Sequence, residues 1–170
     1  MDKIANKIRK QILKISYEAG ACHISSALSC VDILVNLFWK VLKKDDIFLF
    51  SKASGAAAFY CILAEKGIIP EDKLVFYLKN YPLVSTEILG IIHSTGSLGH
   101  GLSVACGLAL AKKLNNEKGQ VYCLISDAEL QEGSVWEAIL FARHHNLFNL
   151  ILIVDRNNYF IEDFISRISQ

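Results

Sequence analysis

A glycine-rich stretch in the middle of the 170-residue chain has the composition of a phosphate-binding loop. Five of the ten glycines fall between Gly90 and Gly107, and the segment His93–Leu102 runs into a stretch of good helix formers. A glycine-rich loop before a helix offers backbone N–H groups and the positive end of the helix dipole to a phosphate. The spacing matches neither the dinucleotide-binding nor the Walker pattern. A loop that lets a small-residue helix pack closely on a sheet is therefore an equal alternative.

Two hard oxygen donors lie at the ends of two apolar segments further along the chain. Asp127 follows the segment 120–126, and Asn157 comes shortly after the segment 149–154. In parallel α/β sheets, ligands bind outside the carboxyl ends of the strands. A carboxylate and an amide oxygen suit Mg²⁺, which takes a few protein oxygens together with substrate phosphates. Taken singly, Asp127 could be a helix N-cap and Asn157 a turn residue, but their coincidence with the glycine loop favours a metal-bound diphosphate.

These candidate residues need a scaffold that brings distant segments together, and the apolar pattern predicts an α/β fold. Strands are expected over 47–50, 120–126 and 149–154, because these short runs are apolar on both faces. Helices are expected from Ile4 to a stop at Gly20, and over 31–42, 56–66, 71–79, 102–114 and 131–146. The order strand, helix, strand over 120–154 predicts a right-handed crossover in a parallel sheet. We therefore expect residues 1–170 to form one domain.

Finer features are expected at the helix starts and faces. A small-residue loop over 21–29 would present His23, and Ser29 with Asp32 has the spacing of a capping box for the next helix. In the helix over 131–146, Leu140 is expected to face inward and Trp136 to belong to the core.

Composition excludes several function classes. The chain has 18 basic and 17 acidic residues, and no basic run is interleaved with aromatics, so we expect no nucleic-acid partner. No apolar run approaches about 18 residues, and the N-terminus lacks a signal-peptide pattern. We therefore expect no membrane partner and a cytoplasmic protein.

The five cysteines show no Cys-x-x-Cys pair and are interpreted as reduced, mostly buried residues. An apolar fraction of 52% indicates a large subunit interface.

Three stretches resemble the amino-terminal domain of transketolase, in the order that this family shows. They are Ser-Thr-Gly-Ser-Leu-Gly-His-Gly-Leu-Ser103, Ser-Asp-Ala-Glu-Leu-Gln-Glu-Gly-Ser-Val-Trp-Glu-Ala138 and Ile-Val-Asp-Arg-Asn157. Ala-Cys-His23 also falls where the family has Gly-His-Pro-Gly, and Ser51-Lys52 matches as well. The resemblance covers nearly the whole chain. It implies a three-layer α/β/α fold with a mostly parallel sheet, the thiamine diphosphate-binding fold of the PP type, in truncated form.

The resemblance also implies a cofactor and roles for particular residues. Thiamine diphosphate would be bound through Mg²⁺, with Asp127, Asn157 and the backbone carbonyl of Tyr159 as metal ligands. His23 would face the reacting carbon, and Glu132 would lie at the contact between two active sites. Members of the family transfer a two-carbon ketol unit between sugar phosphates. The expected cofactor-binding residues are Gly96, Ser97, Leu98, Ser126, Asp127, Ala128 and Asn157.

The chain differs from the family pattern in the residues of two motifs and in its length. The family's Gly-Asp-Gly reads Ser126-Asp127-Ala128, which adds a Cβ where the backbone should approach the diphosphate. The family's Ser-Lys-Gly-His reads Ser-Lys-Ala-Ser54, which loses a histidine. The family's pyrimidine domain is absent from these residues. We therefore expect a separate pyrimidine-domain subunit, in a heterotetramer or another hetero-oligomer. The alternative is a catalytically inactive structural or regulatory subunit, and a third hypothesis is a substrate other than a phosphorylated sugar.

Overall fold

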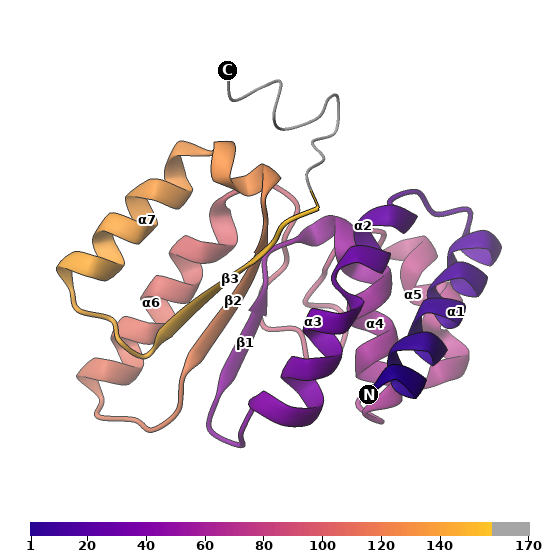
Figure 1. The fold of residues 1–170 in the computed structure, drawn as a ribbon, viewed down its shortest axis with the longest axis horizontal. Coiled ribbons are helices and arrows are strands. Elements are labelled where there is room, and N and C mark those ends of the chain that lie inside the picture. Colours follow the sequence, from indigo (N-terminus) through magenta and orange to yellow (C-terminus); the bar gives the residue numbers. More distant parts are fainter. Residues whose placement is uncertain (158–170) are drawn as a thin grey trace. The chain divides into compact units, whose positions relative to one another are not determined.

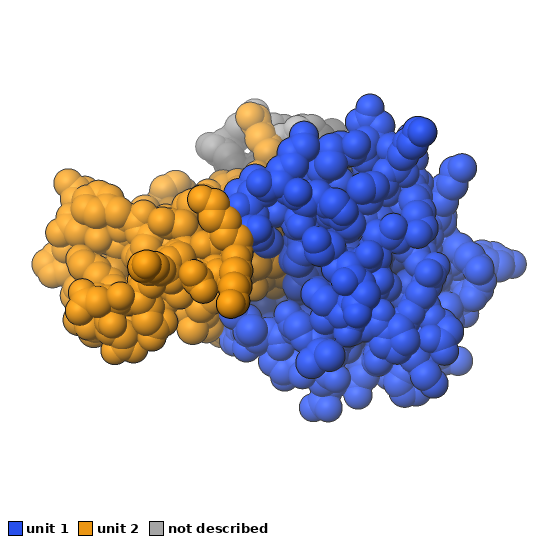
Figure 2. Space-filling view, turned by 90° about the horizontal axis from the view of Figure 1, so that it is seen from below, with its two compact units in different colours: residues 1–42, 53–96 blue, residues 43–52, 97–170 orange. Residues whose placement is uncertain are grey.

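The structure is a computed structural model that describes residues 1–157, and these residues form two compact units (Figures 1 and 2). The first unit comprises residues 1–42 and 53–96, and the second comprises residues 43–52 and the described part of 97–170. Each unit is described by itself below. The single domain expected over residues 1–170 stays a prediction.

The first unit is helical. The spacing predicts an apolar stripe of Ile4, Ile8, Ile12 and Ile15 on its longest helix, α1. The last three are buried, Ile4 is half-buried, and α1 packs on α4 and α5. It ends at Gly20, whose φ of 65° lies in the left-handed region that glycine adopts without a Cβ penalty. The elements of this unit are α1 (Asp2–Ala19), α2 (Ile24–Ser29), α3 (Val31–Asn36), the π-helical turn η1 (Leu37–Val41), the 3₁₀ turn η2 (Ala53–Gly55), α4 (Ala56–Glu65), the 3₁₀ turn η3 (Glu71–Lys73) and α5 (Leu74–Asn80).

Helix α2 differs from the sequence-based expectation. The segment expected as a loop is helical over Ile24–Ser29, and a single residue, Cys30, separates α2 from α3. Ser29 therefore lies inside a helical turn, and its hydroxyl donates to the carbonyl of Ser26 at 3.1 Å instead of capping α3. Asp32 forms an ion pair with Arg9. The predicted capping box is thus wrong, because the preceding helix continues to the residue that would have provided the cap.

The sequence analysis expected no long apolar run, but residues 24–41, which span α2, α3 and η1, form one. This run has a mean hydropathy of 1.4 over 18 residues, which by length and composition would suffice for a membrane span. A core helix meets the same criterion, and a third of the run is buried. The expected absence of a membrane partner stays a prediction.

The second unit contains a three-stranded parallel sheet in the order β1-β2-β3. The central strand β2 is buried at every residue, as its apolar sequence predicts. In register, Ile47 pairs with Val121, and Ser126 pairs with Asp155. Helix α6 packs against the sheet, and α7 packs against α6 (Figure 1). The elements are β1 (Ile47–Phe50), α6 (His100–Leu114), β2 (Val121–Ser126), the 3₁₀ turn η4 (Ala128–Gln131), α7 (Gly133–His144) and β3 (Leu150–Asp155).

Helix α7 is less buried than its sequence suggests. Only Val135 and Ala138 are buried among its described residues, whereas Leu140 is 70% exposed and Trp136 is 54% exposed. The indole N–H of Trp136 donates to the carbonyl of Leu130 at 2.8 Å. The expectation that Leu140 and Trp136 belong to the core is wrong for the described chain, because α7 is covered by α6 along one side while its apolar residues extend round to the other.

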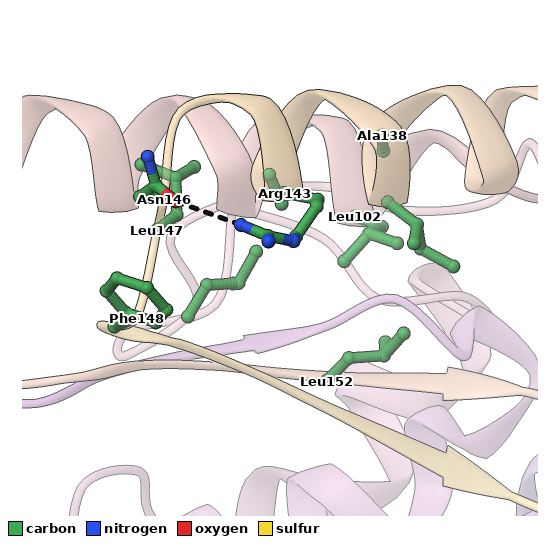
Figure 3. Close-up of a pocket in the computed structure, with 10 residues that line it drawn as sticks. Leu102, Ala138, Arg143, Asn146, Leu147, Phe148 and Leu152 are labelled. Atoms are coloured by element: carbon green, nitrogen blue, oxygen red, sulfur yellow. Dashed lines mark hydrogen bonds between the residues drawn. The ribbon is translucent and has the colours of Figure 1, made fainter.

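A pocket of about 280 Å³ lies between α7 and β3 of the second unit (Figure 3). Of its ten lining residues, all of them within the described chain, only Arg143 and Asn146 are polar, and Arg143 donates to the Asn146 side-chain oxygen at 3.0 Å. Phe148, at its rim, is one of the exposed aromatic residues of this unit. The pocket is mostly apolar, and Arg143 is the charged residue among those that line it.

The start of α6 packs directly against the end of β1. A Cβ placed on Gly101 would overlap the Ser51 hydroxyl, and would lie 2.5 Å from Ser51 Cβ and 3.0 Å from Leu49 Cδ2. Real Cβ atoms do not approach other heavy atoms this closely, so Ser51 and Leu49 leave no room for a side chain at residue 101. The packing role considered for the glycine-rich stretch is therefore observed at Gly101.

We expect Gly101→Ala to lower the free energy of unfolding by about 1–3 kcal/mol, because the added methyl must displace Ser51 or the first turn of α6. Urea denaturation followed by circular dichroism measures the change. The matched control is Gly107→Ala in the same helix, where a Cβ meets nothing within 4 Å. That variant should gain up to about 1 kcal/mol from helix propensity. Equal stability of the two variants would contradict the close packing of α6 on β1.

Candidate functional site

The carboxyl ends of β1, β2 and β3 meet at one edge of the sheet in the second unit. Because Ser126 and Asp155 are paired in register, Asp127 and Asn157 leave adjacent strands at the same edge, one and two residues beyond that pair. Ser51 and Lys52 leave β1 at this edge as well, and both backbone N–H groups donate to the Leu124 carbonyl. The structure thus brings together strand-end residues that are separated by many residues in the sequence.

The structure shows one of the two roles considered for Asp127, the cap. It is the N-cap of η4, where a carboxylate oxygen accepts a hydrogen bond from the Ala128 N–H at 3.1 Å, and its own N–H donates to the Asp155 carbonyl at 3.2 Å. Asp127 is only 6% exposed. An ionised carboxylate has about four acceptor positions, so capping one N–H and ligating a cation are chemically compatible. The N-cap alternative is therefore correct, and it does not exclude the metal-ligand role.

The oxygen donors at this edge fit Mg²⁺ better than a transition metal. Asp127 is buried and Asn157 is half-buried, and both provide hard oxygens. Within residues 1–157, no three His, Cys, Asp or Glu side chains form a group that could hold a metal ion. Mg²⁺ takes few protein oxygens and completes its coordination with phosphate and water. Tyr159, the third predicted ligand, lies outside the described residues.

A buried carboxylate that the sequence analysis missed lies behind Asp127. Glu129 is 0% exposed and accepts four hydrogen bonds, from the Ser51 hydroxyl, the Gly99 N–H at 3.2 Å, and the N–H and hydroxyl of Ser126 at 2.8 and 3.2 Å. Ser126, predicted to contact the cofactor, thus has its N–H directed to Glu129. The available signal was a charged residue three positions after the end of the buried strand β2.

A buried ion pair joins the outer strands at the same edge. Lys52, two residues after the end of β1, pairs with Asp155, the last residue of β3, and both side chains are buried. In the sequence, Ser51-Lys52 and Asp155 stood out only as parts of stretches that resemble the family. Two charges buried together must pair, because an isolated buried charge costs several kcal/mol. The pair fixes the end of β3 two residues before Asn157.

The glycine loop is divided between the two units. Gly96 belongs to the first unit, whereas Ser97, Leu98 and Gly99 belong to the second. Gly99 has a φ of +80°, and a Cβ there would lie 2.5 Å from Ser134 Oγ and 2.8 Å from Glu132 Cβ. Gly99 is also the N-cap of α6 and has no side chain to satisfy the first-turn N–H groups. An uncapped helix start of this kind suits an anion.

The remaining predicted site residues fall in both units. His23 is exposed, belongs to the first unit, and is the N-cap of α2 with a φ of 65°, which is uncommon for a residue other than glycine. In that unit, Ser54 stands where the resemblance expects histidine, and its hydroxyl lies 2.6 Å from the Ser26 hydroxyl. In the second unit, Glu132 is the half-buried N-cap of α7, and Ala128 is buried. The roles of these residues stay predictions.

The cysteines contribute no evident nucleophile. All five are free, and four of them are buried, as expected. Burial raises the pKa of the Cys61 and Cys123 thiols, which keeps them protonated at neutral pH. Cys22 is exposed, unlike the others.

We expect Lys52→Met to lower the free energy of unfolding by about 3–5 kcal/mol, because it leaves Asp155 buried without its cation. The double variant Lys52→Met with Asp155→Leu should recover part of this loss, since it buries no unpaired charge. Glu117→Gln is the control in the same unit, because Glu117 is exposed and faces Lys112 at 3.7 Å. This change should cost less than about 1 kcal/mol. A Lys52→Met protein with the wild-type urea midpoint would refute the buried ion pair.

The whole chain, residues 1–170, matches the family model described as 1-deoxy-D-xylulose-5-phosphate synthase. An apulose-4-phosphate transketolase subunit of Actinobacillus succinogenes is 42% identical, over 92% of this chain and 62% of that protein. The 6-deoxy-6-sulfo-D-fructose transketolase subunit SqwG of a Clostridium species is 32% identical, over 97% of this chain and 65% of that protein. The chain thus spans somewhat less than two thirds of the length of these relatives.

Solved structures show the same fold. A transketolase from Campylobacter jejuni superposes with a TM-score of 0.88 at 30% identity, over 96% of this chain and 29% of that chain. The expected α/β fold class with a parallel sheet is thereby confirmed, and the three-layer α/β/α arrangement is consistent with it. From the match over its full length we conclude that the chain belongs to the family of 1-deoxy-D-xylulose-5-phosphate synthase and transketolase amino-terminal domains.

Proposed function

We propose that this chain is the cofactor-binding subunit of a two-subunit transketolase, a transferase that moves a two-carbon ketol unit between sugar phosphates. The observation that carries the proposal is the pairing of β2 with β3, which directs Asp127 and Asn157 to one sheet edge beside the glycine-loop start of α6. The cofactor would be thiamine diphosphate with Mg²⁺. Two relatives are named as subunits of transketolases, which supports a divided enzyme.

The residues of this chain would hold the diphosphate and the metal. Asp127 and Asn157 supply the side-chain oxygens for Mg²⁺, together with the backbone carbonyl of Tyr159. The amides at the start of α6, with Gly96, Ser97 and Leu98 before them, bind the diphosphate, and the turn Ser126–Ala128 lines it. When bound, thiamine diphosphate supplies the carbanion chemistry of ketol transfer. His23 orients the hydroxyls of the substrate or moves a proton, and Glu132 lies at the contact between two active sites.

The partner would be a pyrimidine-domain subunit, in a heterotetramer or another hetero-oligomer. The exposed apolar residues of α7 support a subunit interface on the second unit, since Trp136, Leu140 and Phe141 are all exposed on one helix. The apolar pocket between α7 and β3 is lined by other residues of the same helix, among them Ile139 and Ala142. Sugar phosphates are the proposed substrates, and the proposed location is the cytoplasm, with no nucleic-acid or membrane partner.

A second candidate is a catalytically inactive structural or regulatory subunit. Two observations favour it. Ala128 stands where the family has glycine, and its N–H is engaged by Asp127. Ser54 stands where the family has histidine, and its hydroxyl is paired with Ser26. Such a subunit would associate with its partner but would bind no cofactor. The name of the Clostridium relative refers to a sulfo-sugar, which leaves a substrate other than a sugar phosphate as a third hypothesis for this chain.

We expect the wild-type chain to bind thiamine diphosphate only when Mg²⁺ is present, and Asp127→Asn to weaken that binding at least about a hundredfold. Asparagine keeps an oxygen that can accept the Ala128 N–H, so the η4 cap is retained while the charge for the metal is lost. Asp127→Ala removes both functions and should also lower stability. Isothermal titration calorimetry with and without EDTA measures the affinity. An Asp127→Asn protein with wild-type affinity would show that Asp127 serves only as the cap.

A further inference from the structure

The most buried acidic side chain at the strand ends has no role in the proposed function so far. Glu129 is 0% exposed, and a carboxylate removed from water must be held by donors. Its two oxygens divide four donors between them. Oε1 accepts from the Ser51 hydroxyl and the Gly99 N–H, and Oε2 accepts from the N–H and the hydroxyl of Ser126. One small planar group thus contacts three segments of the chain.

The division of the donors has a geometric consequence. The oxygen Oε1 holds the glycine loop at Gly99, and Oε2 holds the last residue of β2, directly before Asp127. The two oxygens belong to one rigid carboxylate, so the loop and the strand end cannot separate without breaking a hydrogen bond to a charged group, which is about twice as strong as a neutral one. The reach of one glutamate side chain therefore sets the spacing between the loop and the Asp127 turn.

The loop is also held from its other side. The Ser134 hydroxyl donates to the Gly99 carbonyl at 3.2 Å, while the Gly99 N–H donates to Glu129. Both backbone groups of Gly99 are therefore engaged within the described chain, at a residue whose positive φ and lack of space for a Cβ already restrict it. The arrangement has the features of a pre-formed binding loop, in which the ordering cost is met during folding and not during ligand binding.

We infer that Glu129 is a positioning residue, which fixes the glycine loop relative to the Asp127 turn so that the diphosphate-binding amides and the metal ligand have one spacing before the cofactor arrives. This inference rests on the proposed function. Glu129 itself is buried behind the site and is not expected to touch the metal or the diphosphate.

The test compares the full-length chain with Glu129→Gln and Glu129→Asp. Glutamine keeps the size but presents an NH₂ group to donors, so one oxygen's bonds are lost. Aspartate keeps the charge but is one methylene shorter, so it cannot reach the loop and the strand end together. Hydrogen exchange of the Gly99 amide is measured by NMR without cofactor. Calorimetry then measures the affinity for thiamine diphosphate with Mg²⁺.

We expect the Gly99 amide to exchange about tenfold faster in both variants, and the cofactor to bind about tenfold more weakly. The control is Asn149→Ala, directly before β3 in the same unit. This change removes the 2.8 Å hydrogen bond that the Asn149 side chain donates to the Ala109 carbonyl in α6. This variant should lose stability while keeping the wild-type exchange at Gly99 and the wild-type affinity.

Three results would overturn the inference. The first is an unchanged Gly99 exchange rate in Glu129→Gln, and the second is that Asn149→Ala changes the exchange rate and the affinity as much as the Glu129 variants do. The third is a Glu129→Asp protein with the wild-type exchange rate and affinity, which would show that only the buried charge of Glu129 matters. If Glu129→Gln does not fold, Glu129→Asp alone decides between these outcomes. Failure of the wild-type chain to bind the cofactor, both alone and together with its partner subunit, would instead contradict the proposed function, and the exchange measurement would still show whether Glu129 holds the loop.

Discussion

Polar groups buried at the carboxyl ends of parallel strands must all find partners, and this requirement organises the second unit. The strands β1, β2 and β3 end together, and the polar side chains buried there include Ser51, Lys52, Glu129 and Asp155. Each has a partner from a different segment, Ser51 with Glu129 and Lys52 with Asp155. With this network formed, Asp127 and Asn157 leave the sheet from fixed positions. A site for an anion and a cation can then be pre-formed, because its supports are already satisfied.

The scaffold was largely predictable, because its signals are local. Strand β2 is apolar at nearly every position, and α1 carries its stripe at spacings of three and four, so both were recognised from neighbouring residues. Helix α2 was missed because its small residues, serine and alanine, carry no apolar period. The inward placement of Leu140 and Trp136 failed for a different reason. An apolar residue indicates a contact, but its sequence does not say whether that contact is within the chain or with a partner.

The candidate site was predictable only in part, because its supports are long-range. The rule that ligands bind at carboxyl strand ends was enough to single out Asp127 and Asn157. The support network joins residues 78 positions apart in Ser51–Glu129 and 103 positions apart in Lys52–Asp155, beyond the reach of any local pattern. The roles of His23, Gly96, Glu132 and the other predicted residues come from the family resemblance, and those roles stay predictions. The same holds for Tyr159, which lies outside the described residues.

The central claim is that Asp127 and Asn157 bind a divalent cation together with a diphosphate. The most direct test replaces Mg²⁺ with paramagnetic Mn²⁺ and records backbone amide signals of the chain with and without thiamine diphosphate. The account predicts that the signals of residues 126–128 and 156–157 broaden strongly when both metal and cofactor are present. Signals of residues 115–119, which precede β2 at the opposite end of that strand, should stay sharp under the same conditions. Broadening centred on any other part of the chain, or no site-specific broadening with the cofactor present, would contradict the account.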